Sequence, residues 1–201
     1  MIKNFYLIRH GNTKGTTDRL FYGSTDLPLT QEGKNEIKKL CKKGIYPLAD
    51  NALLYTSGML RTEETFEIIY GKLEHSQVSD LRELGIGNFE MKTYEEVMEN
   101  EEGKAWLSGE KKNIDFPGGD THNEFNERIK RGLNRIFKET CEAGENKEKA
   151  IAVLHGAVIA SAMTMMFPGV KEDLWRWIPD PGCGYKVVFR KNKPVEYKII
   201  R

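Results

Sequence analysis

Apolar and polar positions divide the chain into short apolar runs and longer segments with helical spacing. Residues 5–8 and residues 150–154 are apolar, and these runs end at Arg9 and His155. Residues 52–56 have the same character. Short apolar runs bounded by polar residues and glycine are typical of buried strands. The sequence therefore predicts at least three strands in the core.

Apolar residues spaced three and four positions apart predict helices between these strands. Hydroxyl side chains stand at most of the predicted starts, where they can accept a hydrogen bond from a free backbone N–H. Thr121 and Glu124 form the clearest start, a capping box, and Gly71 is expected to end a helix. The predicted helices run from Thr30 to about Lys43, from Ser57 to Tyr70, from Thr121 to Gly144 and from Gly156 to Phe167.

The other segments carry weaker signals. A strand is indicated near residues 75–79, and residues 80–120 are irregular except for a short helix around residues 94–99. Residues 15–30 form a long connection, which is typical of a functional or mobile loop. Two further segments, joined through residues 193–194, favour a terminal hairpin at one edge of the sheet. These segments are residues 185–189 and 195–200.

The alternation of strands and helices predicts an α/β fold with a mixed sheet. At 201 residues, with 39% hydrophobic and 30% charged content, the chain is expected to form a single domain over residues 1–201. The formal net charge of +1 provides no global field for nucleic acid or an acidic membrane, so neither is expected as a partner.

The cysteines and the hydropathy of the chain indicate in which cellular compartment the protein is expected. Cys41, Cys141 and Cys183 are widely spaced and lack the spacing of a zinc site, which favours reduced thiols. No segment approaches the roughly 18 to 20 apolar residues of a membrane span, and the first residues lack a signal-peptide core. We therefore expect a soluble, cytoplasmic protein.

Candidate chemistry gathers at the carboxyl ends of the predicted strands. If the strands share a sheet, these ends bring together Arg9, His10, Arg61 and His155, and Glu83 arrives from the irregular segment. Two guanidinium groups and two imidazoles around one point suit a phosphate group, because the planar fork of arginine matches its oxygens. The available nucleophile is an imidazole.

A metal site would require clustered carboxylates, and the sequence offers only scattered ones near this edge. They are Asp18, Asp26 and Glu83. The positive side chains must then neutralise a phosphoryl group themselves, so we expect no metal and no cofactor.

Four blocks, in order along the chain, resemble the histidine phosphatase superfamily, also called phosphoglycerate-mutase-like. The resemblance implies a three-layer α/β/α sandwich with a mixed, mostly parallel central sheet and no need for a metal. The blocks are Leu7-Ile8-Arg9-His10-Gly11-Asn12-Thr13, Tyr22-Gly23-x-x-Asp26-x-Pro28-Leu29-Thr30-x-x-Gly33, Ser57-x-x-x-Arg61-Thr62 and Leu154-His155-Gly156.

The same resemblance implies roles for individual residues. His10 would be the nucleophile that becomes phosphohistidine, and Glu83 would be the proton donor. Three residues would hold the phosphoryl group: Arg9, Arg61 and His155. Candidate substrate-binding residues are Asn12, Thr16, Tyr22, Gly23 and Gly156.

Two of these positions depart from the family pattern. Asn12 stands where the family usually has Glu or Gln, and Thr16 stands where it usually has an asparagine that contacts phosphate. A threonine hydroxyl donates only one hydrogen bond, so the sequence leaves open how strongly this position contacts phosphate.

Several functions fit the resemblance. Two further blocks are similar to the α-ribazole phosphatase subfamily, which suggests a small-molecule phosphomonoester with a bulky organic leaving group, such as α-ribazole 5′-phosphate. The alternatives are a broad-specificity sugar-phosphate or phosphoserine phosphatase, a phosphoglycerate mutase, and an inactive protein that binds a phosphorylated ligand. A monomer or a homodimer is expected. The two blocks are Glu83-x-x-x-Gly87-Asn88-Phe89-Glu90-Met91 and Leu174-Trp175-x-x-x-x-Asp180-x-Gly182-Cys183.

Overall fold

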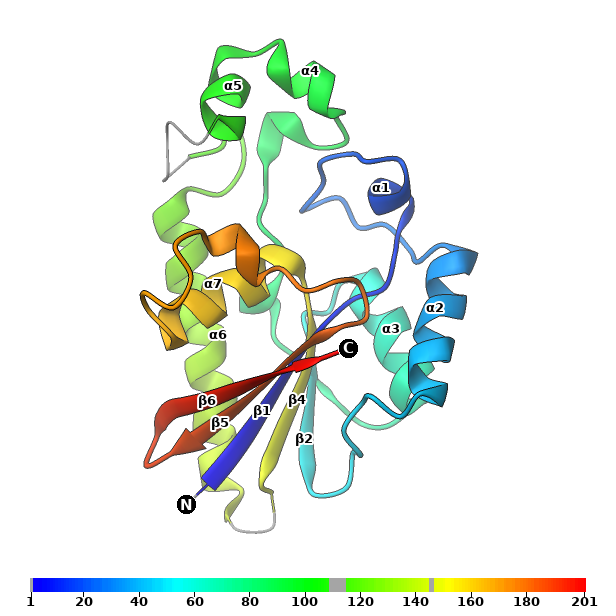
Figure 1. The fold of residues 1–201 in the computed structure, drawn as a ribbon, viewed down its shortest axis with the longest axis vertical. Helices are drawn as coiled ribbons and strands as arrows, with labels where there is room; N and C mark the ends of the chain where they lie inside the picture. The colour runs from blue at the N-terminus through cyan, green and yellow to red at the C-terminus, as the bar shows by residue number, and fades with distance from the viewer. Residues whose placement is uncertain (1, 109–114, 145–146) are drawn as a thin grey trace.

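The strands of the protein form one twisted sheet. The structure is a computed structural model that describes residues 2–108, 115–144 and 147–201. Within these residues, six strands pair in the order β3-β2-β4-β1-β5-β6 (Figure 1). The strands are β1 (Ile2–Arg9), β2 (Ala52–Thr56), β3 (Ser76–Gln77), β4 (Lys149–Leu154), β5 (Gly184–Arg190) and β6 (Lys193–Ile200).

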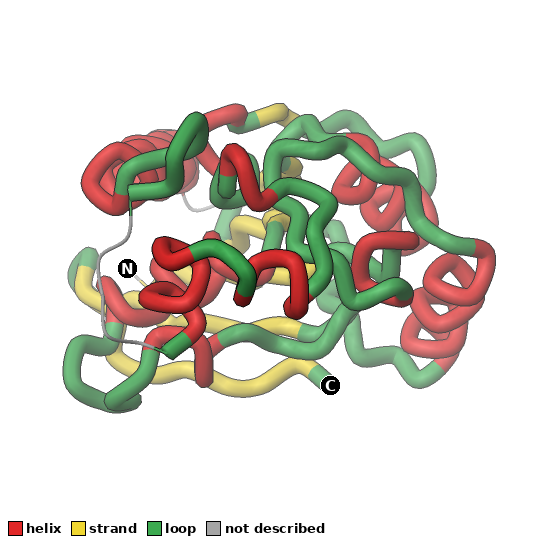
Figure 2. The backbone as a smooth tube through the Cα atoms, turned by 90° about the horizontal axis from the view of Figure 1, so that it is seen from above, coloured by secondary structure: helices red, strands yellow, loops and turns green. Residues whose placement is uncertain are grey.

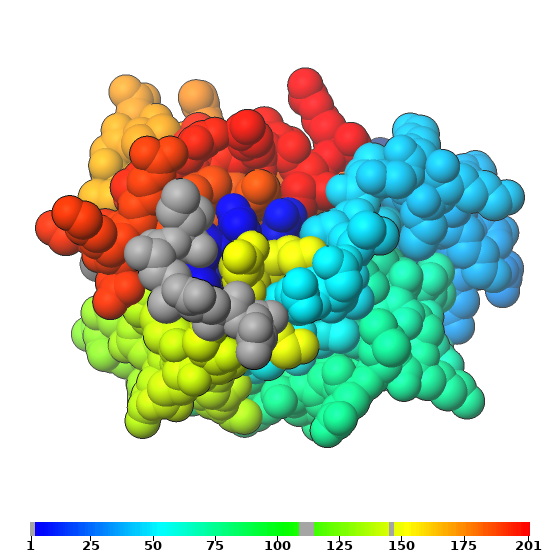
Figure 3. All heavy atoms as spheres, turned by 90° about the horizontal axis from the view of Figure 1, so that it is seen from below, coloured from blue at the N-terminus to red at the C-terminus, as the bar shows by residue number. Residues whose placement is uncertain are grey.

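The sheet is mixed and mostly parallel, as the sequence predicts. The chain pairs β1 with β4, β4 with β2, and β2 with β3 in parallel, whereas β5 runs antiparallel to both β1 and β6. Because Arg9 pairs with Leu154, the residues that follow them, His10 and His155, leave the sheet at the same edge. At the opposite end, seen in Figure 3, β1, β4 and β2 lie next to one another.

Helices cover both faces of this sheet, which gives the expected three layers. In Figure 1, α2 and α3 lie on one face and α6 and α7 on the other. The helices are α1 (Lys14–Thr17), α2 (Gln31–Lys42), α3 (Leu60–Tyr70), α4 (Tyr94–Met98), α5 (Glu101–Leu107), α6 (His122–Glu142) and α7 (Gly156–Met166).

Side chains along each strand point alternately to the two faces of the sheet, and each face carries one half of the core. Leu7 belongs to one buried cluster with Ile129 of α6, whereas its neighbour Ile8 belongs to another with Phe66 of α3. Neighbouring side chains of a strand point to opposite faces, and a strand covered on both faces is therefore apolar throughout. This explains why residues 5–8 of β1 and residues 150–154 of β4 appear in the sequence as unbroken apolar runs. No helix of the described residues combines the length and apolar content needed to cross a membrane.

The segment between residues 80 and 120 is more ordered than the sequence suggests. The predicted helix near residues 94–99 is present as α4, but α5 follows it directly and was not expected. Both lie above the carboxyl ends of the strands, which in the view from above are covered by loops and short helices (Figures 1 and 2). A small apolar cluster of its own supports this segment. Its buried members are Ile86, Phe89, Val97 and Phe116, and the rings of Phe21 and Trp106 pack against them.

Several predicted boundaries need correction. Thr30 and Thr121 cap their helices as expected, but Ser57 does not cap α3, which begins at Leu60 after Met59. Gly71 does end that helix, with a φ of 69°. The Ser57 hydroxyl is instead directed toward the carboxyl end of β4, as described below.

The last two strands form the predicted hairpin with a tighter turn. Its turn residues are Lys191 and Asn192, which both have a positive φ, rather than residues 193–194. Two-residue turns of this kind match the twist of the strands that they connect. Pro194 lies within β6, next to an irregularity in the pairing with β5, where a missing N–H is tolerated.

Candidate active site

His10 follows β1 and is almost completely buried, with 2% of its surface exposed. Its Nδ1 atom lies 2.8 Å from the carbonyl oxygen of Gly11. A carbonyl can only accept, so Nδ1 carries the hydrogen and Nε2 is left with a free lone pair. Burial, reinforced by the charges of Arg61 and Arg9, holds the pKa of His10 well below its usual value. The imidazole is therefore neutral, the form in which nitrogen is a nucleophile.

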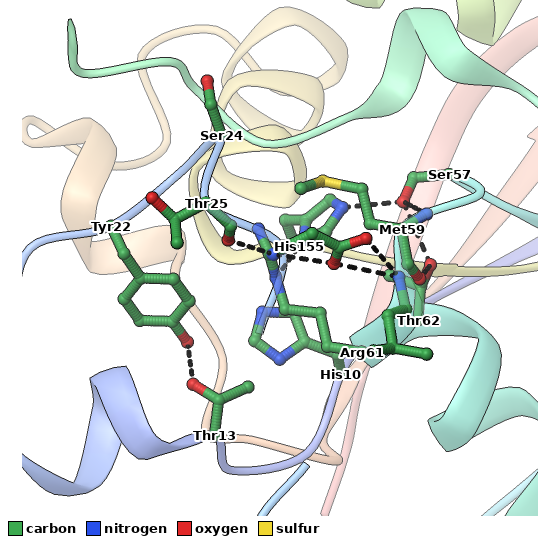
Figure 4. Close-up of polar contacts among 12 residues, drawn as sticks. His10, Thr13, Tyr22, Ser24, Thr25, Ser57, Met59, Arg61, Thr62 and His155 are labelled. Atoms are coloured by element: carbon green, nitrogen blue, oxygen red, sulfur yellow. Dashed lines mark hydrogen bonds and ion pairs between the residues drawn. The ribbon is translucent and has the colours of Figure 1, made fainter. Parts of the chain in front are cut away.

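Arg61, at the start of α3, is fully buried and fixed by the first loop. Its Nη1 donates to the carbonyl of Thr25 at 3.0 Å (Figure 4). Its Nη2 donates to the carbonyl of Gly23 at 2.7 Å. Asp26 lies 3.6 Å from the same guanidinium and also accepts from the backbone N–H of Leu60. The side chain is thus held in place before any ligand binds.

His155 follows β4 and is fully buried beside His10, with the two ring centroids 5.2 Å apart. Its Nδ1 atom accepts from Nε of Arg61 at 3.2 Å, and its Nε2 atom lies 2.7 Å from the Ser57 hydroxyl. Burial is the main cause that lowers the pKa of His155, followed by the positive charge of Arg61. The two imidazoles and Arg61 therefore surround one point, as Figure 4 shows.

Arg9, the last residue of β1, reaches the same place. Its Nη1 atom donates to the carbonyl of Pro179 at 2.8 Å, while its buried Nε atom has no hydrogen-bond partner within the described residues. Gly156 packs against this guanidinium, because a Cβ at that position would lie 3.4 Å from Nε of Arg9. An unpartnered buried donor in a cluster of positive groups is suited to an anion.

Glu83 joins the site from the segment that the sequence left irregular. One carboxylate oxygen accepts from the backbone N–H of Ala157 at 3.3 Å, in the first turn of α7, and the other accepts from Leu84 at 2.9 Å. Helix N-termini favour acidic groups, so α7 helps to hold the carboxylate. Because α7 begins directly after His155, Glu83 lies at the edge of the cationic cluster.

The first loop places Thr16 and Tyr22 together. The Tyr22 hydroxyl lies 2.8 Å from the hydroxyls of both Thr16 and Thr13, and the Tyr22 ring faces the guanidinium of Arg61 at 5.3 Å. Thr16 therefore positions Tyr22 in this structure. Asn12 is turned away, because its amide donates to Glu36 of α2 on the exposed surface.

Gly23 allows the first loop to approach the Glu83 segment. A Cβ at Gly23 would lie 1.6 Å from the carbonyl oxygen of Leu84, so no side chain fits there. The sequence analysis missed Glu90, whose carboxylate accepts from the N–H groups of Gly23, Ser24 and Thr25. These hydrogen bonds outweigh burial and lower the pKa of Glu90. Glu90 thus fixes the loop that in turn fixes Arg61.

The sequence analysis also missed the support behind His155 and Glu83. Ser57 was expected to cap a helix, Thr62 appeared only within a family block, and no local signal marks Asp120 or Arg128 as more than core or surface residues. Ser57 contacts a partner far away in the chain, because it lies 98 positions from His155, and Arg128 reaches the carbonyl of Glu83, 45 positions away.

Side chains supply the positive charge that can bind an anion at this site. In the described part of the chain, no group of three His, Cys, Asp or Glu side chains is arranged to hold a metal ion. A neutral imidazole with a free Nε2 lone pair faces two arginines, and one carboxylate stands at the rim. This arrangement can bind a phosphoryl group and attack its phosphorus in the same place.

Comparisons with known proteins agree with this geometry. A family model described as histidine phosphatase superfamily (branch 1) matches residues 5–199. The chain is 26% identical over 171 residues to phosphoglycerate mutase-like protein 4 of Arabidopsis thaliana, covering 83% of this chain and 72% of the relative. It is 23% identical over 182 residues to adenosylcobalamin/alpha-ribazole phosphatase of Escherichia coli (strain K12), covering 89% and 86%.

A solved structure shares the fold. The alpha-ribazole phosphatase from Shigella flexneri matches with a TM-score of 0.79 at 21% identity, over 95% of this chain and 93% of that one. The family model covers nearly the whole chain, including the elements that carry His10, Arg61 and His155. The protein is therefore an enzyme of the histidine phosphatase superfamily (branch 1).

Proposed function

We propose that the protein is a phosphomonoesterase that acts through a phosphohistidine on His10 and needs no metal. The state of the His10 imidazole carries this proposal. Its Nδ1 hydrogen is used by Gly11, so the lone pair of Nε2 is free, and Arg9 and Arg61 stand beside it. A phosphoryl group bound between the arginines meets a neutral nitrogen nucleophile.

In the first step Nε2 of His10 attacks phosphorus as the bond from phosphorus to the ester oxygen breaks. Glu83 gives its proton to that oxygen, which leaves as an alcohol. Arg9 and Arg61 balance the charge of the transferring phosphoryl group, and positioning of this kind supplies most of the rate in phosphoryl transfer. The preorganised Arg61 does this without rearrangement.

In the second step water attacks the phosphorus of phosphohistidine. Glu83, now a carboxylate, takes a proton from that water, and the bond between phosphorus and Nε2 breaks. Inorganic phosphate leaves and His10 returns to its neutral form. Each residue thus ends the cycle as it began.

For the substrate we propose a small phosphomonoester with an organic leaving group, possible examples being α-ribazole 5′-phosphate and related nucleoside phosphates. Two observations support this choice: a relative bears the name alpha-ribazole phosphatase, and the α4–α5 segment with its aromatic cluster stands over the site. Other relatives are named as phosphoglycerate mutases, so a mutase is the second candidate.

One screen tests the proposal and separates the two candidates. The purified protein is incubated with α-ribazole 5′-phosphate, sugar phosphates, phosphoserine and 3-phosphoglycerate, and both inorganic phosphate and isomerised substrate are measured. We expect release of phosphate, and none with His10→Ala. Isomerisation of 3-phosphoglycerate without release of phosphate would replace the phosphatase by the mutase. A protein that binds these esters but turns none over would be a binding protein.

A further inference from the structure

Both ring nitrogens of His155 are engaged by groups whose hydrogen-bonding roles are fixed. Nδ1 lies 3.2 Å from Nε of Arg61, which can only donate. Nδ1 must therefore present its lone pair. A neutral imidazole carries one hydrogen, so with Nδ1 accepting from Arg61 that hydrogen lies on Nε2.

A chain of hydroxyls leads to the same assignment from the other side. The Thr62 hydroxyl donates to the carbonyl of Met59 at 2.7 Å, and its oxygen lies 3.0 Å from the Ser57 hydroxyl. Since Thr62 uses its hydrogen on the carbonyl, Ser57 must donate to Thr62. Ser57 then has no hydrogen left for His155, so Nε2 of His155 donates to Ser57. Figure 4 shows this chain at the edge of the site.

The hydrogen-bonded hydroxyls of Ser57 and Thr62 are shielded from water, so water does not help to reverse the direction of their hydrogen bonds. Ser57, Thr62 and His155 are all buried. The backbone N–H of Met59 donates to Ser57 at 3.3 Å and uses part of its remaining acceptor capacity. The Met59 carbonyl also accepts from the backbone N–H groups of Thr62 and Glu63, so the direction is decided at the His155 end. The reverse direction would place two hydrogens between Arg61 Nε and His155 Nδ1. Unpaired buried polar groups of this kind are costly.

We propose that the chain from Ser57 through Thr62 to Met59 fixes one proton on Nε2 of His155, so that an anion can be bound at Nδ1 only when His155 takes up a second proton. Nδ1 is the nitrogen on the side of Arg61, and its lone pair would repel a phosphate oxygen. The second proton comes from solvent and makes Nδ1 a donor. Arg61 Nε and His155 Nδ1 then both donate to the anion instead of to each other.

The charged groups around His155 make this proton dependent on the anion. Burial acts to keep the imidazole neutral, together with the charges of Arg61 of α3, His10 and Arg9 of the β1 end, and Arg128 of α6. A bound dianion reverses that balance. Glu83, held by the N–H of Ala157, is the nearby carboxylate. Ser57 and Thr62 are thus positioning residues, and the inference rests on the proposed phosphoryl site.

The first test measures protons taken up on anion binding. Inorganic phosphate and sulfate are titrated into the full-length protein by calorimetry, in buffers with different ionisation enthalpies near pH 7.5. Sulfate carries no proton at this pH, so any proton must go to the protein. We expect uptake of about one proton per sulfate and an affinity that falls roughly tenfold for each pH unit. Sulfate binding without uptake overturns the inference and leaves the proposed function standing. Absence of any anion binding overturns both.

Matched variants show which imidazole is protonated. In Thr62→Val, Ser57 is free to donate to Nε2, so His155 can carry its single hydrogen on Nδ1 and bind sulfate without proton uptake. Thr62→Ser keeps the hydroxyl and should keep the uptake. Ser57→Ala removes the acceptor and should also abolish the uptake. Uptake that is unchanged in Thr62→Val and Ser57→Ala would assign the proton to His10 and overturn the inference.

Nuclear magnetic resonance of the wild-type protein provides a readout that does not depend on a variant that folds. The chain has four histidines, so ¹⁵N-labelled imidazoles can be assigned with single variants. We expect His155 to show a hydrogen on Nε2 alone in the free protein and on both nitrogens with sulfate. A free protein with the hydrogen on Nδ1, or a sulfate complex with a neutral His155, contradicts the proposal.

Discussion

Arg128 of α6 forms a buried ion pair with Asp120, with 2.6 Å between Nη2 and Oδ2. The same guanidinium donates to the backbone carbonyls of Arg82 and Glu83, at 2.5 Å and 2.8 Å. Asp120 in turn accepts from the N–H of Gly85. One ion pair therefore holds the backbone on both sides of the proposed proton donor.

Removal of Arg128 should destabilise the protein strongly. Only 3% of Arg128 is exposed, and Arg128→Met would leave Asp120 without its main partner together with several unpaired carbonyls. Loss of one member of a buried pair costs roughly 3 to 5 kcal/mol. The measurement is the free energy of unfolding in urea. Arg131→Met is the matched control on the same helix, since its pair with Asp80 is exposed and is worth about 1 kcal/mol or less. Equal losses in the two variants would contradict this reading.

Glu90 should make stability depend on pH in the acid range. Hydrogen bonds to the first loop lower its pKa below the usual value of 4.5. A lowered pKa in the folded protein means that the stabilisation is complete above about pH 4.5 and is lost as the pH falls through the lower folded value. Glu90→Gln should therefore be less stable than wild type near pH 7, and the difference should shrink toward pH 3. Unfolding curves at several pH values test this, and a difference that does not vary with pH counts against it.

The fold could be predicted from the sequence where local pattern decides the structure. The apolar runs before His10 and His155 could be recognised as strands, because a strand covered on both faces is apolar throughout. Parallel pairing of the two strands then brings the two histidines together. The boundaries that failed depend on distant partners. Ser57 has the residue type of a helix cap, but its hydroxyl is used by His155, 98 positions later.

The segment above the site, within residues 80–120, was also hard to predict from local sequence pattern. Its short helices α4 and α5 show little helical periodicity in their apolar residues. Trp106 of α5 packs against Phe21, which comes from a distant part of the chain. Glu83 could be identified only through its resemblance to a family motif. The sequence alone indicated neither Arg128 as the support of the Glu83 backbone nor Glu90 as the support of the first loop.

Activity should not depend on a divalent metal ion. Arg9 and Arg61 supply the positive charge that a metal would otherwise bring to a phosphoryl group. Hydrolysis of p-nitrophenyl phosphate should therefore continue unchanged in excess EDTA, and vanadate, which mimics pentacoordinate phosphorus, should inhibit it. Loss of activity in EDTA that Mg²⁺ restores would refute the mechanism.

His10→Ala should abolish turnover while the protein stays folded. Within the described residues, the His10 side chain donates its hydrogen bond to the neighbouring Gly11, and it contributes its nucleophilic nitrogen to the proposed reaction. Labelled substrate and an alkaline quench should trap a phosphoprotein that is labile to acid and stable to base in wild type only. His122→Ala is a control for loss of a histidine elsewhere. Undiminished label in His10→Ala would assign the nucleophile to another residue, with His155 tested first.

Glu83→Gln should lower the rate of phosphoryl transfer most for substrates whose leaving group needs a proton. General acid catalysis is worth roughly 10² to 10⁴ in rate, and an alkoxide needs that proton far more than p-nitrophenolate does. We therefore expect kcat/KM, which reports transfer of the phosphoryl group to His10, to fall much more on an alkyl phosphate than on p-nitrophenyl phosphate. Phosphohistidine should also accumulate in the variant, because the same carboxylate activates water in the second step.

A second carboxylate on the same segment provides the control for this experiment. Asp80 pairs with Arg131 at 3.0 Å on the surface rather than with the first turn of α7. Asp80→Asn should change the two rates by the same small factor, because it removes charge without removing the proton donor. If Glu83→Gln also lowers both rates equally and traps no intermediate, Glu83 has a structural role. The proton donor would then have to be sought elsewhere, and not at Glu90, whose oxygens already accept from the N–H groups of the first loop.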